Sequence, residues 1–245
     1  MSEISDAVGR MDAAAAVKAA EGMDRDEAEA EVREAVFRAE KGYTAGRTAF
    51  PKLMGTVKTA YEVREALGIP RPDLGKAVVA TLDIHTEGRN LMALLLGIEG
   101  FDTDIVEEGM MPDDIAARCR QDGVTACVVS GEFASIDTKM RAVDRELRKL
   151  GIRDRIIFCC GGQPVSEEGA RRAGADVFDQ NGAESVRKLR DAVLARRARR
   201  GLTRRSRDIR SPSGCPTPSS RPSRCGARSS AIRTRTRGCG RCRRS

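Results

Sequence analysis

The sequence from Lys76 to Gly88, KAVVATLDIHTEG, begins with an apolar run and ends in a polar loop that leads into a helix-like segment. Ala77–Leu82 is too short for a typical helix and is rich in the residue types that favour strands. A continuous apolar run of this length is typical of a strand that is buried on both faces. We therefore expect a buried strand at 77–82, with the polar residues 83–88 at its carboxyl end.

Short apolar runs continue to alternate with amphipathic stretches along the following chain. Four further runs have the length of a strand: Thr103–Val106, Ala126–Val129, Ile156–Cys160 and Ala175–Phe178. Helix-like segments lie between and after them, at 89–98, 112–121, 136–150, 166–174 and 186–193. Strands that alternate with helices form a parallel sheet that is covered on both faces. The predicted fold class is therefore α/β, with a flavodoxin-like (Rossmann-like) five-stranded parallel sheet.

The sequence before this region predicts a different unit. Residues 12–69 are rich in Ala and Glu, and their apolar residues recur at helical spacing. Gly68, Pro70 and Pro72 end the helical pattern and form a linker that reaches Gly75. We expect a small helical bundle domain with its linker over 1–75 and the α/β domain over 76–200.

Residues 201–245 form a third, basic segment. They contain 13 Arg, one acidic residue, four of the nine Pro and no aromatic residue. This composition cannot bury enough apolar surface to offset the entropy lost on ordering, so we expect a disordered tail. Its four Cys lack the spacing of a zinc site. A translated wrong reading frame is the alternative origin of the abrupt change in composition.

Charge and hydropathy narrow the classes of function. The formal net charge of +8 comes from the tail, because residues 1–200 hold 31 basic and 35 acidic side chains. A basic tail without aromatic residues has no means of base stacking, so we do not expect a nucleic-acid partner. No apolar stretch approaches the roughly 18 residues of a membrane span, and no secretory signal follows Met1. We expect a cytoplasmic protein that has no membrane partner.

The ends of three predicted strands carry polar residues and glycines. Ligands of such folds bind outside the carboxyl ends of the strands, where the strand order reverses. The residues in question are Asp83, His85 and Gly88 after the first strand, Ser130 after the third, and Gly161 and Gly162 after the fourth. Because His85 is the only histidine of the chain, most hydrolytic triads are excluded.

His85 has the chemistry of a metal ligand. A neutral imidazole binds a metal through one nitrogen while its other nitrogen donates to a nearby acceptor, and Asp83 is placed to be that acceptor. One histidine without neighbouring Cys or His cannot hold a bare ion, since transition metals in proteins need three or four donors. The remaining donors would come from a macrocycle, which points to a tetrapyrrole-type cofactor with His85 as an axial ligand.

The pattern Asp83-x-His85-x-x-Gly88, followed by Ser130 and Gly161-Gly162, resembles the D-x-H-x-x-G, S and GG signature of cobalamin-binding domains. The resemblance implies that His85 replaces the cofactor's own dimethylbenzimidazole as lower axial ligand of cobalt. It also implies that the displaced nucleotide tail enters a cleft lined by the serine and the two glycines.

Two further stretches are similar to the corrinoid proteins of methyltransferase systems. They are Gly161–Val165, GGQPV, and Phe50–Met54, FPKLM, which lies in the predicted bundle. The chain departs from the family pattern at several positions. Ala134 stands where the family commonly has a hydroxyl residue, and Ser135 is the candidate to replace it, whereas Glu132 lies in a stretch that is normally apolar.

The resemblance implies a corrinoid carrier that binds cobalamin, with methylcobalamin as the expected form. Such a carrier shuttles a methyl group between a substrate-specific methyltransferase and an acceptor methyltransferase, and a reductive activator is a further expected partner. The sequence contains no nucleophile paired with a base and no phosphate loop. Two alternatives remain open: the cobalamin-binding subunit of an adenosylcobalamin-dependent mutase, and a cobalamin-dependent sensor or regulator. The helical unit and the GGQPV stretch argue against the mutase.

Overall fold

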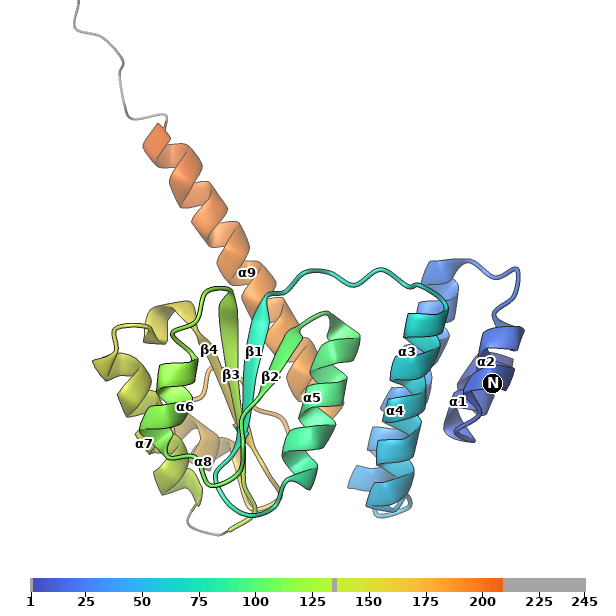
Figure 1. Ribbon diagram of the computed structural model, residues 1–245, viewed down its shortest axis with the longest axis horizontal. Helices are drawn as coiled ribbons and strands as arrows, with labels where there is room; N and C mark the ends of the chain where they lie inside the picture. The colour runs from blue at the N-terminus through green and yellow to red at the C-terminus, as the bar shows by residue number, and fades with distance from the viewer. Residues whose placement is uncertain (1, 134–135, 209–245) are drawn as a thin grey trace, which may run out of the picture.

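The structure is a computed structural model that describes residues 2–133 and 136–208, with side chains described as far as residue 199. Four helices form a bundle, and the rest of the described chain forms an α/β unit (Figure 1). The bundle consists of α1 (Glu3–Gly9), α2 (Ala13–Ala19), α3 (Arg25–Thr44) and α4 (Phe50–Ala66).

Local capping signals determine where the bundle helices begin. Side-chain oxygens of Ser2, Asp12 and Asp24 accept backbone N–H groups at the starts of α1, α2 and α3. These bonds satisfy donors that the first turn of a helix leaves free. Pro51 lies in the first turn of α4, where its missing N–H costs nothing. The helical prediction for 12–69 is confirmed in kind, while α1 lies before that range.

A four-stranded parallel sheet forms the centre of the α/β unit (Figure 1). Its strands are β1 (Lys76–Thr81), β2 (Asp102–Ile105), β3 (Val124–Ser130) and β4 (Ile157–Gly161). All pairings are parallel, in the order β2-β1-β3-β4. The strand order therefore reverses between β1 and β3, which is where open parallel sheets bind their ligands.

The prediction of a fifth strand at Ala175–Phe178 is wrong, because Val177 makes only an isolated parallel bridge to Cys159. The physical reason is the side chain of Asp176. Its carboxylate accepts the backbone N–H of Phe158 at 2.8 Å and so occupies a donor that a fifth strand would need. The sheet has four strands, and the segment around Val177 borders β4 without extending the ladder.

Helices cover both faces of the sheet, as the buried strands predict. They are α5 (Glu87–Glu99), α6 (Pro112–Arg118), α7 (Ile136–Lys149), α8 (Glu167–Arg172) and α9 (Gly182–Asp208), with a short 3-10 helix at Arg153–Arg155. Alternate side chains of a strand point to opposite faces. Accordingly Val79 and Val128 pack with α5 and α9, whereas Val78 and Val129 pack with α6, α7 and α8.

The bundle lies on the outer side of α5 and α9 (Figure 1), and its buried residues belong to the same apolar core as that face of the sheet. α4 ends at Ala66 and β1 begins at Lys76, so residues 67–75 connect the two parts. α9 continues to Asp208, past the predicted domain boundary at 200, and the rest of the predicted tail lies outside the described residues. No helix in the described part of the chain is long and apolar enough to cross a membrane.

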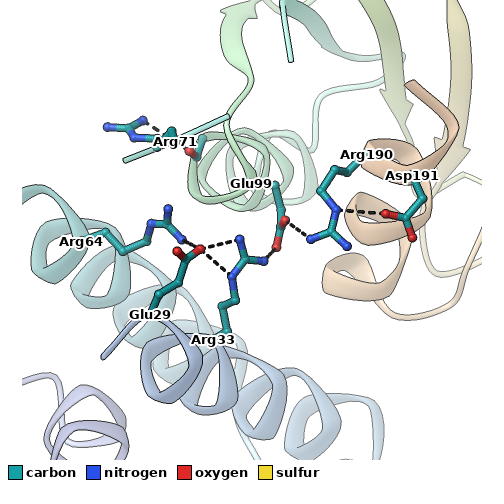
Figure 2. A network of polar contacts seen from close by, with 8 residues as sticks. Glu29, Arg33, Arg64, Arg71, Glu99, Arg190 and Asp191 are labelled. Atoms are coloured by element: carbon teal, nitrogen blue, oxygen red, sulfur yellow. Dashed lines mark hydrogen bonds and ion pairs between the residues drawn. The ribbon is translucent and has the colours of Figure 1, made fainter. Parts of the chain in front are cut away.

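A chain of ion pairs joins the bundle to α5 and α9 (Figure 2). Glu99 of α5 accepts hydrogen bonds from Arg33 of α3 and, at 2.8 Å, from Arg190 of α9. Glu29 of α3 pairs with Arg33 and with the buried Arg64 of α4, both at 2.7 Å. Glu99 is only 7% exposed, and the two arginines that compensate its charge come from distant parts of the chain. The network therefore helps to hold the bundle against the α/β unit.

Replacing Glu99 by Ala should weaken this contact, because it leaves Arg33 and Arg190 without their shared partner. We expect the free energy of unfolding, measured by urea denaturation, to fall by about 1–3 kcal/mol. The matched control is Glu62→Ala, which removes an exposed acid of α4 that lies 3.8 Å from Lys58. Exposed pairs of this kind contribute less than about 1 kcal/mol. Equal losses in the two variants would contradict an anchoring role for Glu99.

Candidate functional site

The segments that follow β1, β3 and β4 meet at the carboxyl edge of the sheet. The pairing registers place Thr81 beside Ser130 and Ser130 beside Gly161. These three residues form one row across the edge, and the loop that contains His85 leaves β1 directly after that row. The structure therefore brings together residues that lie up to 80 positions apart in the chain, from Thr81 to Gly161.

The buried carboxylate of Asp83 organises this edge. Its Oδ1 accepts the backbone N–H of His85 at 2.8 Å, and its Oδ2 accepts the backbone N–H of Glu132 at 2.6 Å. The Thr81 hydroxyl donates to the His85 carbonyl at 2.8 Å and lies 3.3 Å from Asp83 Oδ1. One side chain thus connects the loop after β1 to the loop after β3.

The pKa of Asp83 reflects two opposing effects. Burial by itself raises the pKa of this carboxyl group. The N–H groups of Glu132 and His85, the His85 ring and the Thr81 hydroxyl act in the other direction, and the net pKa lies below its ordinary value. A carboxylate is therefore present beside the imidazole at neutral pH.

The imidazole of His85 presents one ring nitrogen to that carboxylate. Nδ1 is buried and lies 3.3 Å from Asp83 Oδ1, although the two atoms lack the geometry of a hydrogen bond. The side chain is 37% exposed, and its ring meets the Phe133 ring edge-on with centroids 5.4 Å apart. With Nδ1 directed at a carboxylate, Nε2 is the nitrogen that remains for a ligand. Within the described residues, no group of three or more His, Cys, Asp and Glu side chains is placed to hold a metal ion.

A cavity of about 400 Å³ lies beside His85. Its walls come from the carboxyl ends of β3 and β4, from the first turns of α5 and α9, and from α3 and α4 of the bundle. Much of the lining is apolar and includes Leu91, Met92, Val128 and Cys159. The volume lies within the range of about 300–1,000 Å³ that is typical of small-molecule sites.

The predicted glycines have different structural roles at this cavity. Gly162 has a φ of +132°, and a Cβ at this position would lie 1.9 Å from the carbonyl oxygen of Gly131. Only glycine fits there. A Cβ on Gly161 would meet no atom within 4 Å, whereas one on Gly88 would lie 3.7 Å from Ser130 Oγ. Gly161 therefore leaves free space in the cavity wall.

Most of the predicted site residues line this one cavity, namely His85, Gly88, Ser130, Gly161 and Gly162. Asp83 lies beside the His85 ring, with its Oδ1 3.3 Å from Nδ1. Ser135 lies outside the described residues.

Sequence reasoning did not identify the α3 residues that the bundle contributes to the site. Glu40 and Tyr43 of α3 line the cavity, and Tyr43 Oη lies 3.2 Å from Gln163 Nε2, which donates to it from the loop after β4. A signal for Glu40 was present, because it lies four and eight residues after Val36 and Val32 on the buried face of α3. An acid is rare at such a position.

Glu40 is 2% exposed and lies between α3 and the start of α9. Its Oε2 accepts the backbone N–H of Gly182 at 3.2 Å, while its Oε1 is buried and has no hydrogen-bond partner in the described part of the chain. Burial raises the pKa of Glu40 to about 7, although the N–H groups of Gly182 and Ala183 oppose the shift. The neutral and the ionised carboxyl therefore coexist near neutral pH.

The raised pKa of Glu40 should make the protein less stable as pH increases. Between the ordinary pKa of 4.5 and the folded-state pKa of about 7, the folded protein retains a proton that the unfolded chain has released. This contribution is complete below pH 4.5 and is lost as pH rises through 7; at about 1.4 kcal/mol per pKa unit it totals roughly 3 kcal/mol. Urea denaturation of the wild type and of Glu40→Gln, whose amide does not titrate, should show a difference that declines over this range. A difference that stays constant would contradict the raised pKa.

The fold is shared with proteins of known structure. A four-stranded parallel α/β sheet follows a helical bundle, and a histidine loop and a glycine pair flank a pocket at the strand ends. The fold is similar to that of a crystal structure of a cobalamin-binding protein from Desulfitobacterium hafniense DCB-2, with a TM-score of 0.67 at 20% identity over 77% of this chain and 96% of that chain. The methanol:cobalamin methyltransferase complex from Methanosarcina barkeri has a TM-score of 0.58 at 20% identity, over 79% and 78% of the two chains. These structures confirm the predicted α/β fold.

The sequence comparison identifies a relative. Trimethylamine corrinoid protein 1 from Methanosarcina acetivorans is 24% identical over 143 residues, which cover 58% of this chain and 65% of that protein. The aligned part of the chain thus spans slightly less than two thirds of that relative. No protein-family model matches the chain. The predicted resemblance to the corrinoid proteins of methyltransferase systems is confirmed.

Proposed function

We propose that the protein is a corrinoid carrier that binds cobalamin with His85 as the lower axial ligand of cobalt. The observation that carries the proposal is the position of the His85 ring, which has Nδ1 at the buried Asp83 carboxylate and the cavity of β3 and β4 beside it. The similarity to a trimethylamine corrinoid protein supports it. Nothing in the relative or in the two solved structures favours a mutase subunit or a sensor.

The residues at the strand ends fit the proposed cofactor. Asp83, which is ionised, would fix the tautomer and the direction of the His85 ring, so that Nε2 points to the metal. The Ser130 hydroxyl and the free space at Gly161 would receive the nucleotide tail. A cavity of about 400 Å³ would hold only the tail of a corrinoid, with the macrocycle outside it.

The bound corrinoid would supply a cobalt centre that carries a methyl group, and methylcobalamin is the form that we propose for the loaded state. This chain would bind and orient the cofactor, and the chemistry would require partners. We propose a substrate-specific methyltransferase, an acceptor methyltransferase and a reductive activator as those partners, in the cytoplasm. The likeness in fold to a chain of a methanol:cobalamin methyltransferase complex supports an association with methyltransferases.

Replacing His85 by Ala should remove the axial nitrogen without removing the pocket. After reconstitution with hydroxocobalamin and reduction to cobalt(II), the wild type should show hyperfine coupling to a protein nitrogen in its electron paramagnetic resonance spectrum. The variant should lose this coupling and bind cobalamin more weakly, by at least the roughly 10- to 100-fold that loss of a residue supporting a metal ligand costs.

Imidazole added to His85→Ala provides the control for this experiment. Imidazole labelled with nitrogen-15 should restore the coupling with the splitting of the new isotope, because the ring can occupy the space that the side chain left. Nitrogen coupling that is unchanged in His85→Ala without added imidazole would remove histidine ligation from the proposal.

Filling the free space at Gly161 should exclude the nucleotide tail. A Cβ at Gly161 meets no atom within 4 Å, so Gly161→Val should fold normally. Its two methyl groups would occupy the pocket, and overpacking of this kind costs about 1–3 kcal/mol, which corresponds to a roughly 5- to 150-fold weaker binding of cobalamin. Binding of cobinamide, which lacks the nucleotide tail, should change little.

The matched control is Gly9→Val at the end of α1, where a Cβ also meets no atom within 4 Å. It should leave the affinities for both corrinoids unchanged. If Gly161→Val weakens cobalamin and cobinamide binding equally, the tail does not occupy this pocket.

A further inference from the structure

Glu40 of the bundle lines the cavity that we assign to the nucleotide tail, and one oxygen of its carboxyl group lacks a hydrogen-bond partner among the described residues. The side chain is 2% exposed, and its Oε1 has no partner in the described part of the chain. Oε2 is held by the N–H of Gly182 at 3.2 Å, which fixes the orientation of the carboxyl group. A buried polar atom without a partner is uncommon in folded proteins, and at a cavity it indicates a ligand group that completes its hydrogen bonds.

The rest of the cavity wall restricts what that ligand group is. Leu91, Val128 and Cys159 offer apolar surface, which suits the faces of a flat aromatic ring. The wall also includes Glu87, Glu132 and Asp179, and this group of acids would repel the negative charge of a phosphate. A nitrogen heterocycle combines apolar faces with a single polar edge atom, and a carboxyl group that is partly neutral at neutral pH can donate to that atom.

We propose that Glu40 donates a hydrogen bond from its free carboxyl oxygen to the ring nitrogen of the lower base at the end of the corrinoid's nucleotide tail. The proposal rests on the proposed function and extends it, because it makes the bundle a part of the cofactor site. Glu40 would then help to select corrinoids by their lower base. The carboxyl group would act at the tail and not at the metal.

Glu40→Leu and Glu40→Gln test this proposal through the dissociation constants of two corrinoids, measured by absorption titration. Leu removes the donor, so the affinity for cobalamin should fall about five- to tenfold, the value of one neutral hydrogen bond. Gln keeps an N–H donor and should bind within about twofold of the wild type on the same basis. Cobinamide, which has neither base nor tail, should bind all three proteins alike. Glu34→Leu, an exposed acid on the same helix, is the control for the lost charge.

A second ligand series on the wild-type protein does not depend on how the variants fold. A cobamide whose lower base is a phenol ring keeps the tail but has no ring nitrogen. The wild type should bind it about five- to tenfold more weakly than cobalamin, and Glu40→Leu should not distinguish the two ligands.

Three results would overturn the proposal. The first is an unchanged affinity of Glu40→Leu for cobalamin. The second is an equal loss of affinity for cobalamin and cobinamide in this variant, which would indicate a purely structural role beside Gly182. The third is equal affinity of the wild type for the two cobamides that differ in their lower base. A wild-type protein that binds no corrinoid would instead overturn the proposed function itself. The two failures are therefore distinguishable.

Discussion

The site depends on one buried carboxylate. Asp83 lies two residues after the end of β1, and its two oxygens accept N–H groups from the loops after β1 and β3, at 2.8 Å from His85 and 2.6 Å from Glu132. Charge-assisted hydrogen bonds of this kind are roughly twice as strong as neutral ones, and in a buried position the loss of any donor would leave a costly unpaired charge. The same carboxylate lies beside His85 Nδ1. The carboxylate that connects the two loops is therefore also the charged group nearest to the buried imidazole nitrogen.

Much of this edge could be predicted because it is encoded locally. Five buried residues of β1 followed by Asp83 and His85 predict a strand end at a ligand site. The prediction of a fifth strand was wrong because the apolar run at Ala175–Phe178 contains Asp176, whose carboxylate accepts a hydrogen bond from the Phe158 N–H. A polar residue inside a short apolar run carries no indication of which backbone group it will bind. Only the tertiary structure decides whether such a segment extends the sheet as a strand or makes an isolated bridge.

The contribution of the bundle could not be predicted, since it depends on contacts between distant segments. Glu40 lies 142 positions from Gly182, and Tyr43 lies 120 positions from Gln163. Helical periodicity places Glu40 on the buried face of α3 but does not specify the helix start or the cavity it will meet. The packing of α3 against α9 provides that information, and no spacing rule in the sequence contains it.

Two acids thus connect the bundle to the α/β unit in different electrostatic states. Glu99 has Arg33 and Arg190 as partners, so its charge is compensated by two cations that are each about a quarter exposed. Among the described residues, the Glu40 carboxyl group accepts hydrogen bonds only from backbone N–H groups, and burial raises its pKa to about 7. A buried carboxyl group that is compensated by no cation is unfavourable for the empty protein. If the only role of Glu40 were to hold the bundle against the α/β unit, an ion pair such as that of Glu99 would be sufficient. The arrangement of Glu40 is therefore better explained by a ligand in the cavity than by the packing of the two parts.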